Sequence, residues 1–180
     1  MPGIDELAAA VGRAGFSCTG CSECCRQVAD DSNLVVASPP EIREIMAATG
    51  MAWEDIAEPY PDFIEDEKGK CYTFAWCIRR SNDACIFLEG GRCTIYTHRP
   101  WICRTYPFML EGEELLISEC PGVGSPLSPG EAQTIARLLI WRQAAEHREE
   151  ECIRAHFARD ALPGGRRTVI DSEGVKVLDG

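Results

Sequence analysis

Cysteine is the residue type that most constrains what this chain can become. Eleven cysteines occur among 180 residues, and four of them fall within the run Cys18-Thr19-Gly20-Cys21-Ser22-Glu23-Cys24-Cys25. This density far exceeds what core packing needs from a small apolar side chain. A tight loop can direct several thiols at one centre, so the run predicts metal binding.

Two cysteines of this run, Cys24 and Cys25, are adjacent in the chain. Neighbouring side chains in extended backbone point to opposite sides, so one metal ion could take both sulfurs only across a strained turn. We therefore expect at least one of the two to face a second centre or the core.

A second group of cysteines is spread along the chain as Cys85, Cys93, Cys103 and Cys120. Each lies in or beside turn-rich sequence, and turns can converge on a metal more easily than positions strung along one element. Core packing is the alternative for this group. Eight thiols could form two four-ligand centres, or one centre with spare or redox-active cysteines, and the spacing leaves this choice open.

Three further cysteines have a weaker connection to metal. Cys71 and Cys77 end a strand-like run whose alternation puts both on one face, so shared binding and core packing are equally compatible with it. Cys152 has helical spacing from apolar neighbours and is expected to pack in the core.

Among the histidines, His98 could complete a site of three cysteines and one histidine. The other two, His147 and His156, are expected at the surface.

The location expected for the chain follows from its termini, apolar runs and charge. The first residues lack the basic and apolar regions of a secretory signal, and no apolar run approaches the roughly 20 residues of a membrane span. We therefore expect a cytoplasmic protein, where a reducing environment disfavours disulfides. A net charge of −11 argues against a nucleic-acid partner, which needs clustered Lys and Arg.

Periodicity and turn signals predict an α+β fold in a single domain over 1–180, a size that one core can serve. The expected elements are a first short helix closed by Gly12 or Gly15, a capped helix from Ser38 to about Gly50, and a turn-rich surface connection over 53–70 that has helical spacing at first. They continue with short extended pieces around Gly90-Gly91, a long helix over 129–159 and a terminal hairpin or tail over 165–180. The cysteine-rich, metal-centred core is expected to span 16–121.

Ordered motifs in this core resemble the YkgJ-type cysteine-cluster family, also called the CxxCxxCC zinc- or iron-chelating domain. The matching stretches are Phe16 to Cys25, Cys85-Ile86-Phe87-Leu88, Cys93 to Phe108 with Arg99-Pro100-Trp101-Ile102-Cys103-Arg104 at its centre, and Cys120-Pro121. The resemblance implies metal binding through the eight matching cysteines and leaves zinc or iron open. Ser22 stands where glycine is common in the family, and Cys71 and Cys77 lie outside its core motif.

The cysteine pattern and the resemblance lead to two hypotheses about the bound metal and one about an associated activity. All-thiolate ligation favours an iron–sulfur cluster, 4Fe–4S in type, for electron transfer or metalloenzyme maturation with a redox protein or metalloenzyme as partner. Arg99 and Arg104 would then bind beside the anionic cluster, unless they pair with surface acids. Structural zinc in an interaction module is the alternative. A similar cluster in flagellin lysine N-methylases implies a methyltransferase-associated protein as a further alternative, but no nucleotide fingerprint or catalytic residue is found.

Overall fold

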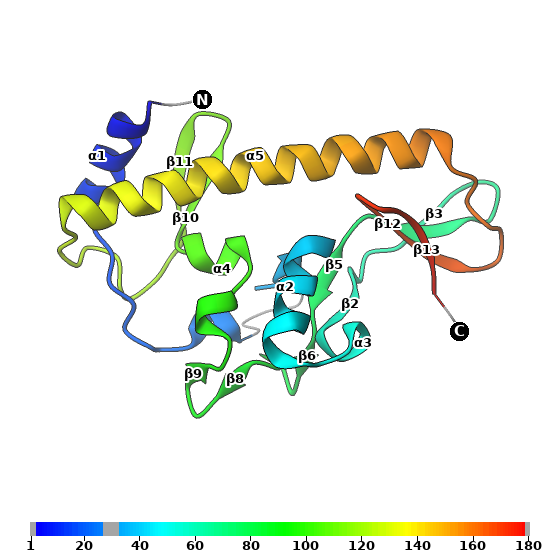
Figure 1. Ribbon diagram of the computed structural model, residues 1–180, viewed down its shortest axis with the longest axis horizontal. Coiled ribbons are helices and arrows are strands. Elements are labelled where there is room, and N and C mark those ends of the chain that lie inside the picture. Colours follow the sequence, from blue (N-terminus) through cyan, green and yellow to red (C-terminus); the bar gives the residue numbers. More distant parts are fainter. Residues whose placement is uncertain (1–2, 27–32, 179–180) are drawn as a thin grey trace.

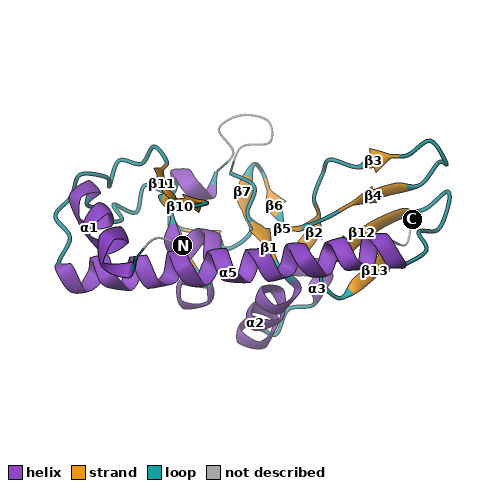
Figure 2. Cartoon of the chain, turned by 90° about the horizontal axis from the view of Figure 1, so that it is seen from above, coloured by secondary structure: helices purple, strands orange, loops and turns teal. Residues whose placement is uncertain are grey.

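The computed structural model of the protein describes residues 3–26 and 33–178 and has an α+β architecture, as predicted. Its longest element is the helix α5, Pro129–Arg159, which has 31 residues and runs along the length of the molecule (Figures 1 and 2). The helix begins with a capping box, in which the Ser128 backbone N–H donates to the Glu131 carboxylate over 2.9 Å. The predicted long helix is therefore confirmed with the same bounds.

The first layer against α5 lies near its N-terminal end. Helix α1, Ile4–Ala14, packs there and ends at Gly15, and the hairpin of β10, Phe108–Glu111, and β11, Glu114–Ile117, closes the same region (Figure 1). Their shared core consists of Leu7, Ala8, Val11, Phe108, Ala132, Ala136 and Leu139. This core fixes the start of α5 against the segments that carry the cysteines.

A second core lies below the middle of α5. A three-stranded antiparallel sheet has the order β1, Val36–Ala37, then β5, Trp76–Ile78, then β2, Ala57–Pro59. Helices α2, Pro39–Thr49, and α3, Trp53–Ile56, bury Ile42, Ile45 and Ile56 against it. The helical spacing expected at the start of 53–70 corresponds to α3, but the surface placement is wrong there, because α3 and β2 enter the core.

The C-terminal residues form the predicted hairpin and complete a second sheet. Strand β12, Arg167–Asp171, pairs with β13, Gly174–Val177, and runs parallel to β4, Cys71–Thr73, which pairs with β3, Ile64–Glu65. The run from Cys71 to Cys77 is thus divided between β4 and β5, which belong to different sheets. Cys71 and Cys77 do not share one strand face, contrary to the expectation.

Short elements connect these layers and carry five of the eleven cysteines. They are the 3-10 turn η1, Glu23–Cys25; the hairpin of β6, Arg80–Ser81, and β7, Ala84–Cys85; the hairpin of β8, Leu88–Glu89, and β9, Arg92–Cys93; the 3-10 turn η2, Tyr96–His98; and helix α4, Trp101–Thr105. The hairpin predicted around Gly90-Gly91 is confirmed. None of the helices in the described ranges is long and apolar enough to cross a membrane.

Candidate metal centre

The first cysteine run folds into a tight turn that presents two adjacent thiols on the same side. Ser22 adopts a left-handed conformation, with φ 65° and ψ 9°, and η1 follows it directly. The Ser22 hydroxyl donates to the Gly91 carbonyl oxygen over 2.9 Å, which ties the turn to the β8–β9 hairpin. The Sγ atoms of Cys24 and Cys25 then lie 3.9 Å apart. Our expectation that one of them faces elsewhere is wrong, because the turn replaces extended backbone.

Three cysteines of the second group, Cys85, Cys93 and Cys103, come from neighbouring elements. Cys85 ends β7, and Cys93 ends β9, where it pairs with Leu88 across the hairpin. Cys103 lies in α4, whose first turn is closed by a hydrogen bond from the Cys103 N–H to the Pro100 carbonyl. The Gly-Gly turn therefore positions Cys93, and the proline before α4 positions Cys103, whereas Cys85 is placed by the β6–β7 hairpin.

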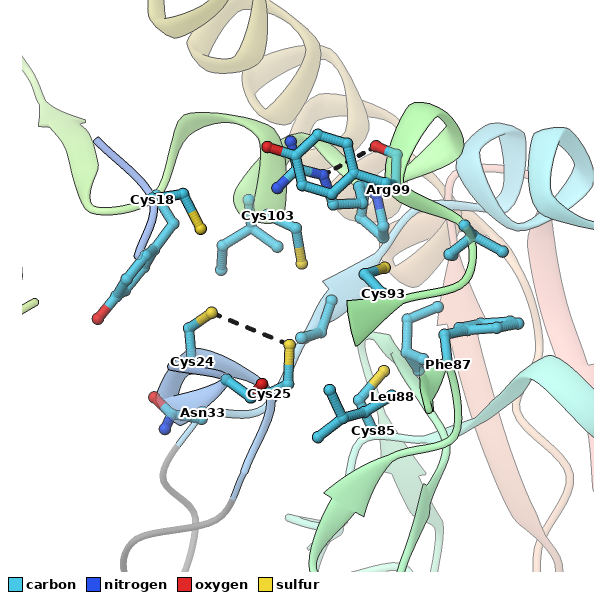
Figure 3. A pocket seen from close by; sticks show the side chains of 18 of the residues that line it. Cys18, Cys24, Cys25, Asn33, Cys85, Phe87, Leu88, Cys93, Arg99 and Cys103 are labelled. Carbon is cyan, nitrogen blue, oxygen red and sulfur yellow. Dashed lines mark hydrogen bonds between the residues drawn. The ribbon is translucent and has the colours of Figure 1, made fainter. Parts of the chain in front are cut away.

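Six of the eight predicted ligands line one cavity of about 560 Å³: Cys18, Cys24, Cys25, Cys85, Cys93 and Cys103. Figure 3 shows the sulfur atoms of Cys24, Cys25 and Cys103 directed into the space between them, with Cys18 and Cys93 beside it. The rest of the wall is largely apolar, with Phe87, Ile95, Ile102 and Phe108 among its side chains. Segments far apart in sequence thus bring thiols to a common space.

The other two predicted ligands, Cys21 and Cys120, are not part of the lining of this cavity. The segment with Cys120 reaches the first run through an N–H to carbonyl bond from Ser17 to Gly122, 3.0 Å long. Tyr106 lines the cavity, and its pKa is raised by burial and further by the nearby thiols of Cys120, Cys24 and Cys21. Both cysteines are therefore within electrostatic range of the cavity wall.

The cavity thiols differ in how readily they ionise. The hydrogen bond between the two thiols lowers the pKa of Cys25 and raises the pKa of Cys24. On the inner wall, burial raises the pKa of Cys85 and raises that of Cys103 to about 12. Thiol ligands must be deprotonated to hold a metal, so binding here is coupled to proton release.

Every charged residue that lines the cavity within the described chain is an arginine: Arg92, Arg99 and Arg142. This is notable in a protein of net charge −11. Arg99 holds its place through its Nε, which donates to the Tyr96 carbonyl over 2.9 Å, and its guanidinium lies 3.7 Å from the centre of the Tyr96 ring. A cavity lined by thiols and cations suits an anionic thiolate–metal centre.

Several candidates from the sequence lie away from the cavity lining. Arg104 and His98 both contact the Glu44 carboxylate, at 2.8 and 3.5 Å, so Arg104 follows the alternative of pairing with a surface acid. Cys77, on β5, is fully buried and does not line the cavity. Cys152 is exposed, so our expectation that it packs is wrong; its neighbour Ile153 packs against the core instead.

Arg142, like Arg92, is a cavity residue that the sequence patterns did not predict. It lies on α5, and its side chain is only 7% exposed. A signal for it was available, because Arg142 continues the buried stripe of Ala132, Ala136 and Leu139 along the helix, where a charged side chain is costly. The many polar residues of α5 make this stripe hard to recognise in the sequence.

The cysteine donors are suited to binding a metal, although the sulfur atoms do not converge on one ion position. Within 3–26 and 33–178, no three His, Cys, Asp or Glu side chains form a preformed ion site. Two thiolates on one tetrahedral ion lie about 3.8 Å apart, given metal–sulfur bonds of roughly 2.3 Å, and the Cys24–Cys25 distance of 3.9 Å matches this. Soft sulfur donors select zinc or iron–sulfur clusters over hard cations.

The cavity and its donors thus define a cysteine-rich protein of the metal-chelating class. Comparison with known proteins gives the same class, because a family model described as CxxCxxCC, a putative zinc- or iron-chelating domain, matches residues 17–122. More than half of the chain is covered, and the chain belongs to this family. No solved structure matches it.

Proposed function

We propose that the protein carries an iron–sulfur cluster of the 4Fe–4S type in the cysteine cavity and serves electron transfer or the maturation of a metalloenzyme. The observation that carries this proposal is the cavity itself, about 560 Å³ with six cysteines on its wall. One ion bound through bonds of roughly 2.3 Å needs much less room than this. A bound cluster would supply one-electron redox chemistry.

The cationic lining supports the same occupant. A cluster held by four thiolates is anionic, and its potential depends on nearby charge and hydrogen bonds. Arg92 and Arg99 lie on the wall and offer positive charge at short range, and the structure describes no acidic lining residue. Their role would be to offset the charge of the thiolates and of the occupant.

Exposure of the first cysteine run supports a function that involves a protein partner. Cys18, Cys21 and Cys24 are exposed, whereas Cys85, Cys93 and Cys103 are half-buried. Electron transfer and cluster transfer both require a partner to approach the metal closely, and this side of the cavity permits it. The eight cysteines also exceed the four that one cluster needs, so some would be available for exchange.

Structural zinc is the second candidate, and the 3.9 Å separation of the Cys24 and Cys25 sulfurs favours it. In that reading the ion would tie the first run to the β8–β9 hairpin and contribute folding energy. The wide distribution of the other thiols around the cavity favours the cluster, which is why zinc comes second.

Purification without oxygen separates the two candidates. We expect brown protein with broad visible absorbance and comparable amounts of iron and acid-labile sulfide. Colourless protein with about one zinc per chain would replace the cluster by the zinc module. Protein with neither metal, even after reconstitution with iron and sulfide or with zinc, would remove the proposed function altogether.

A further inference from the structure

Arg142 joins the cysteine cavity to a part of the chain that lies outside the matched family domain. The domain ends at residue 122, whereas Arg142 lies in the middle of α5. Its side chain lines the cysteine cavity and also a second cavity of about 300 Å³ beside it. Arg142 is therefore part of the wall between the two.

The hydrogen bonds of Arg142 connect α5 to the element that carries Cys103. Its Nη1 donates over 2.9 Å to the hydroxyl of Thr105, which is only 1% exposed and in turn donates to the Trp101 carbonyl. Thr105 is the last residue of α4, two positions after Cys103. The guanidinium therefore holds the end of the short helix that presents this thiol.

The charge of Arg142 has an incomplete set of partners. Its Nε donates to Glu146 over 2.7 Å, but Glu146 is 56% exposed, so solvent screens much of that carboxylate. Among the described residues no hydrogen bond is found for Nη2, and no fully buried side-chain nitrogen or oxygen lacks a partner. This N–H edge therefore keeps some access to the cavity space and is open to another acceptor. Burying such a charge is costly unless an anion lies near it.

Acidic groups on the other side of Arg142 suggest a simpler role for its positive charge. Glu41, Glu149 and Asp171 line the second cavity, and Arg142 could serve only to balance their charge. Asp171 is already bonded, because it accepts from the Trp76 indole over 2.9 Å, and Glu41 accepts from the Trp101 N–H over 2.7 Å. Glu149 has a hydrogen bond with the Ser172 side chain. These bonds reduce the need of the three carboxylates for a cation, so the thiol side is the larger source of unbalanced negative charge once metal is bound.

We infer that Arg142 completes the metal centre from outside the family domain, as a positioning residue that fixes α4 and balances the charge of the thiolates. This inference rests on the proposed function, in that it needs a metal held by the cavity cysteines. It implies that α5 is a functional part of the site, and that residues 17–122 without it would bind metal weakly.

The test compares three variants and one control in the full chain. Arg142→Gln removes the charge, Arg142→Lys keeps it, and Thr105→Val removes the hydrogen-bond acceptor while leaving the arginine in place. Arg137→Gln removes the same charge from an exposed position of the same helix. Metal affinity is measured by chelator competition, and the unfolding of the metal-free protein is measured separately.

We expect Arg142→Gln to weaken metal affinity by about 10-fold or more, which is the loss typical of groups that support metal ligands. Arg142→Lys should recover most of it, and Arg137→Gln should change it by less than about twofold. Thr105→Val should destabilise the metal-free protein yet lose less affinity than Arg142→Gln. If the metal is a cluster, Arg142→Gln should also lower its reduction potential at unchanged iron content.

Two results would overturn the inference. Unchanged affinity and potential in Arg142→Gln, with normal binding by the wild type, would mean that Arg142 only balances the second cavity. An affinity loss shared equally by Arg142→Gln, Arg142→Lys and Thr105→Val, in proportion to the lost stability, would mean a structural role alone. Failure of the wild-type protein to bind zinc or iron would instead remove the proposed function, which is a distinguishable outcome.

Discussion

Two arginines that follow each other closely in the chain have different surroundings. Arg99 lines the cysteine cavity, whereas Arg104 pairs with Glu44 and has its guanidinium 5.3 Å from the centre of the Trp101 ring. The sequence placed both beside the metal because both flank Cys103. Side-chain direction, which separates them, depends on the turn before α4 and cannot be read from spacing.

We predict that Arg99→Gln lowers the reduction potential of a bound cluster by about 20–40 mV, because a nearby cation favours the more negative reduced form. This range corresponds to the roughly 0.5–1 kcal/mol of a partly screened charge interaction. Voltammetry at equal iron content measures it, with Arg104→Gln as the matched control. A larger shift in the control than in Arg99→Gln would contradict the placement of these side chains relative to the metal.

For Cys24 and Cys25, the sequence predicts the identity of the ligands and not the direction of their side chains. Their identity as candidate ligands was evident from sequence, but their common direction depends on the left-handed Ser22, and serine rarely adopts that conformation. The hydrogen bond from Ser22 to Gly91 helps to hold it, and this contact joins positions 69 residues apart. A contact between residues so far apart in the chain cannot be predicted from the local sequence pattern.

At Gly122 the segment that contains Cys120 packs against the segment that leads into the first cysteine run. A Cβ at this position would overlap the Ser17 carbonyl oxygen, which is backbone and cannot move aside independently. We predict that Gly122→Ala destabilises the protein by about 1–3 kcal/mol, as overpacking does, and lowers bound metal. Denaturant unfolding and metal analysis measure the two effects.

The control for this prediction is Gly130→Ala, at the start of α5, where an added Cβ has no heavy atom within 4 Å among the described residues. Its stability should be unchanged or slightly higher, because alanine favours a helix over glycine. Equal destabilisation by both substitutions would show that the contact of Gly122 with Ser17 has no special importance.

Glu149, on α5, is expected to make the stability of the protein depend on pH where α5 meets the C-terminal hairpin. Burial raises the pKa of Glu149, and the nearby carboxylates of Glu41, Asp171 and Glu173 act in the same direction. Its protonated form is therefore favoured by folding, so this contribution to stability is present at low pH and is lost as pH rises through the folded pKa.

We predict that Glu149→Gln raises the melting temperature relative to the wild type at neutral pH, and that this advantage shrinks as the pH falls towards 4. Scanning calorimetry at several pH values measures the difference. An advantage that is absent at neutral pH, or that grows on acidification, would show that the carboxylate is adequately solvated or compensated.

Local signals predicted individual elements better than they predicted the packing of the whole molecule. Capping boxes at Ser38 and Ser128 fixed the starts of α2 and α5, and Gly90-Gly91 fixed a hairpin, because each depends on neighbouring residues. The division of the Cys71–Cys77 run between two sheets, the exposure of Cys152 and the approach of Arg142 to the cavity depend on tertiary packing. These are the features that sequence did not provide.

At the scale of the molecule, the central claim is that the cavity beneath α5 is where metal is bound. The most direct measurement is metal per chain in Cys103→Ser and Cys152→Ser, each purified without oxygen beside the wild type. Cys103 is half-buried on the cavity wall, and Cys152 is exposed on α5 and not part of that wall. We predict that Cys103→Ser loses most of its metal and unfolds more easily, because metal binding contributes to folding, while Cys152→Ser keeps both at wild-type level. Full metal content in Cys103→Ser would contradict the account.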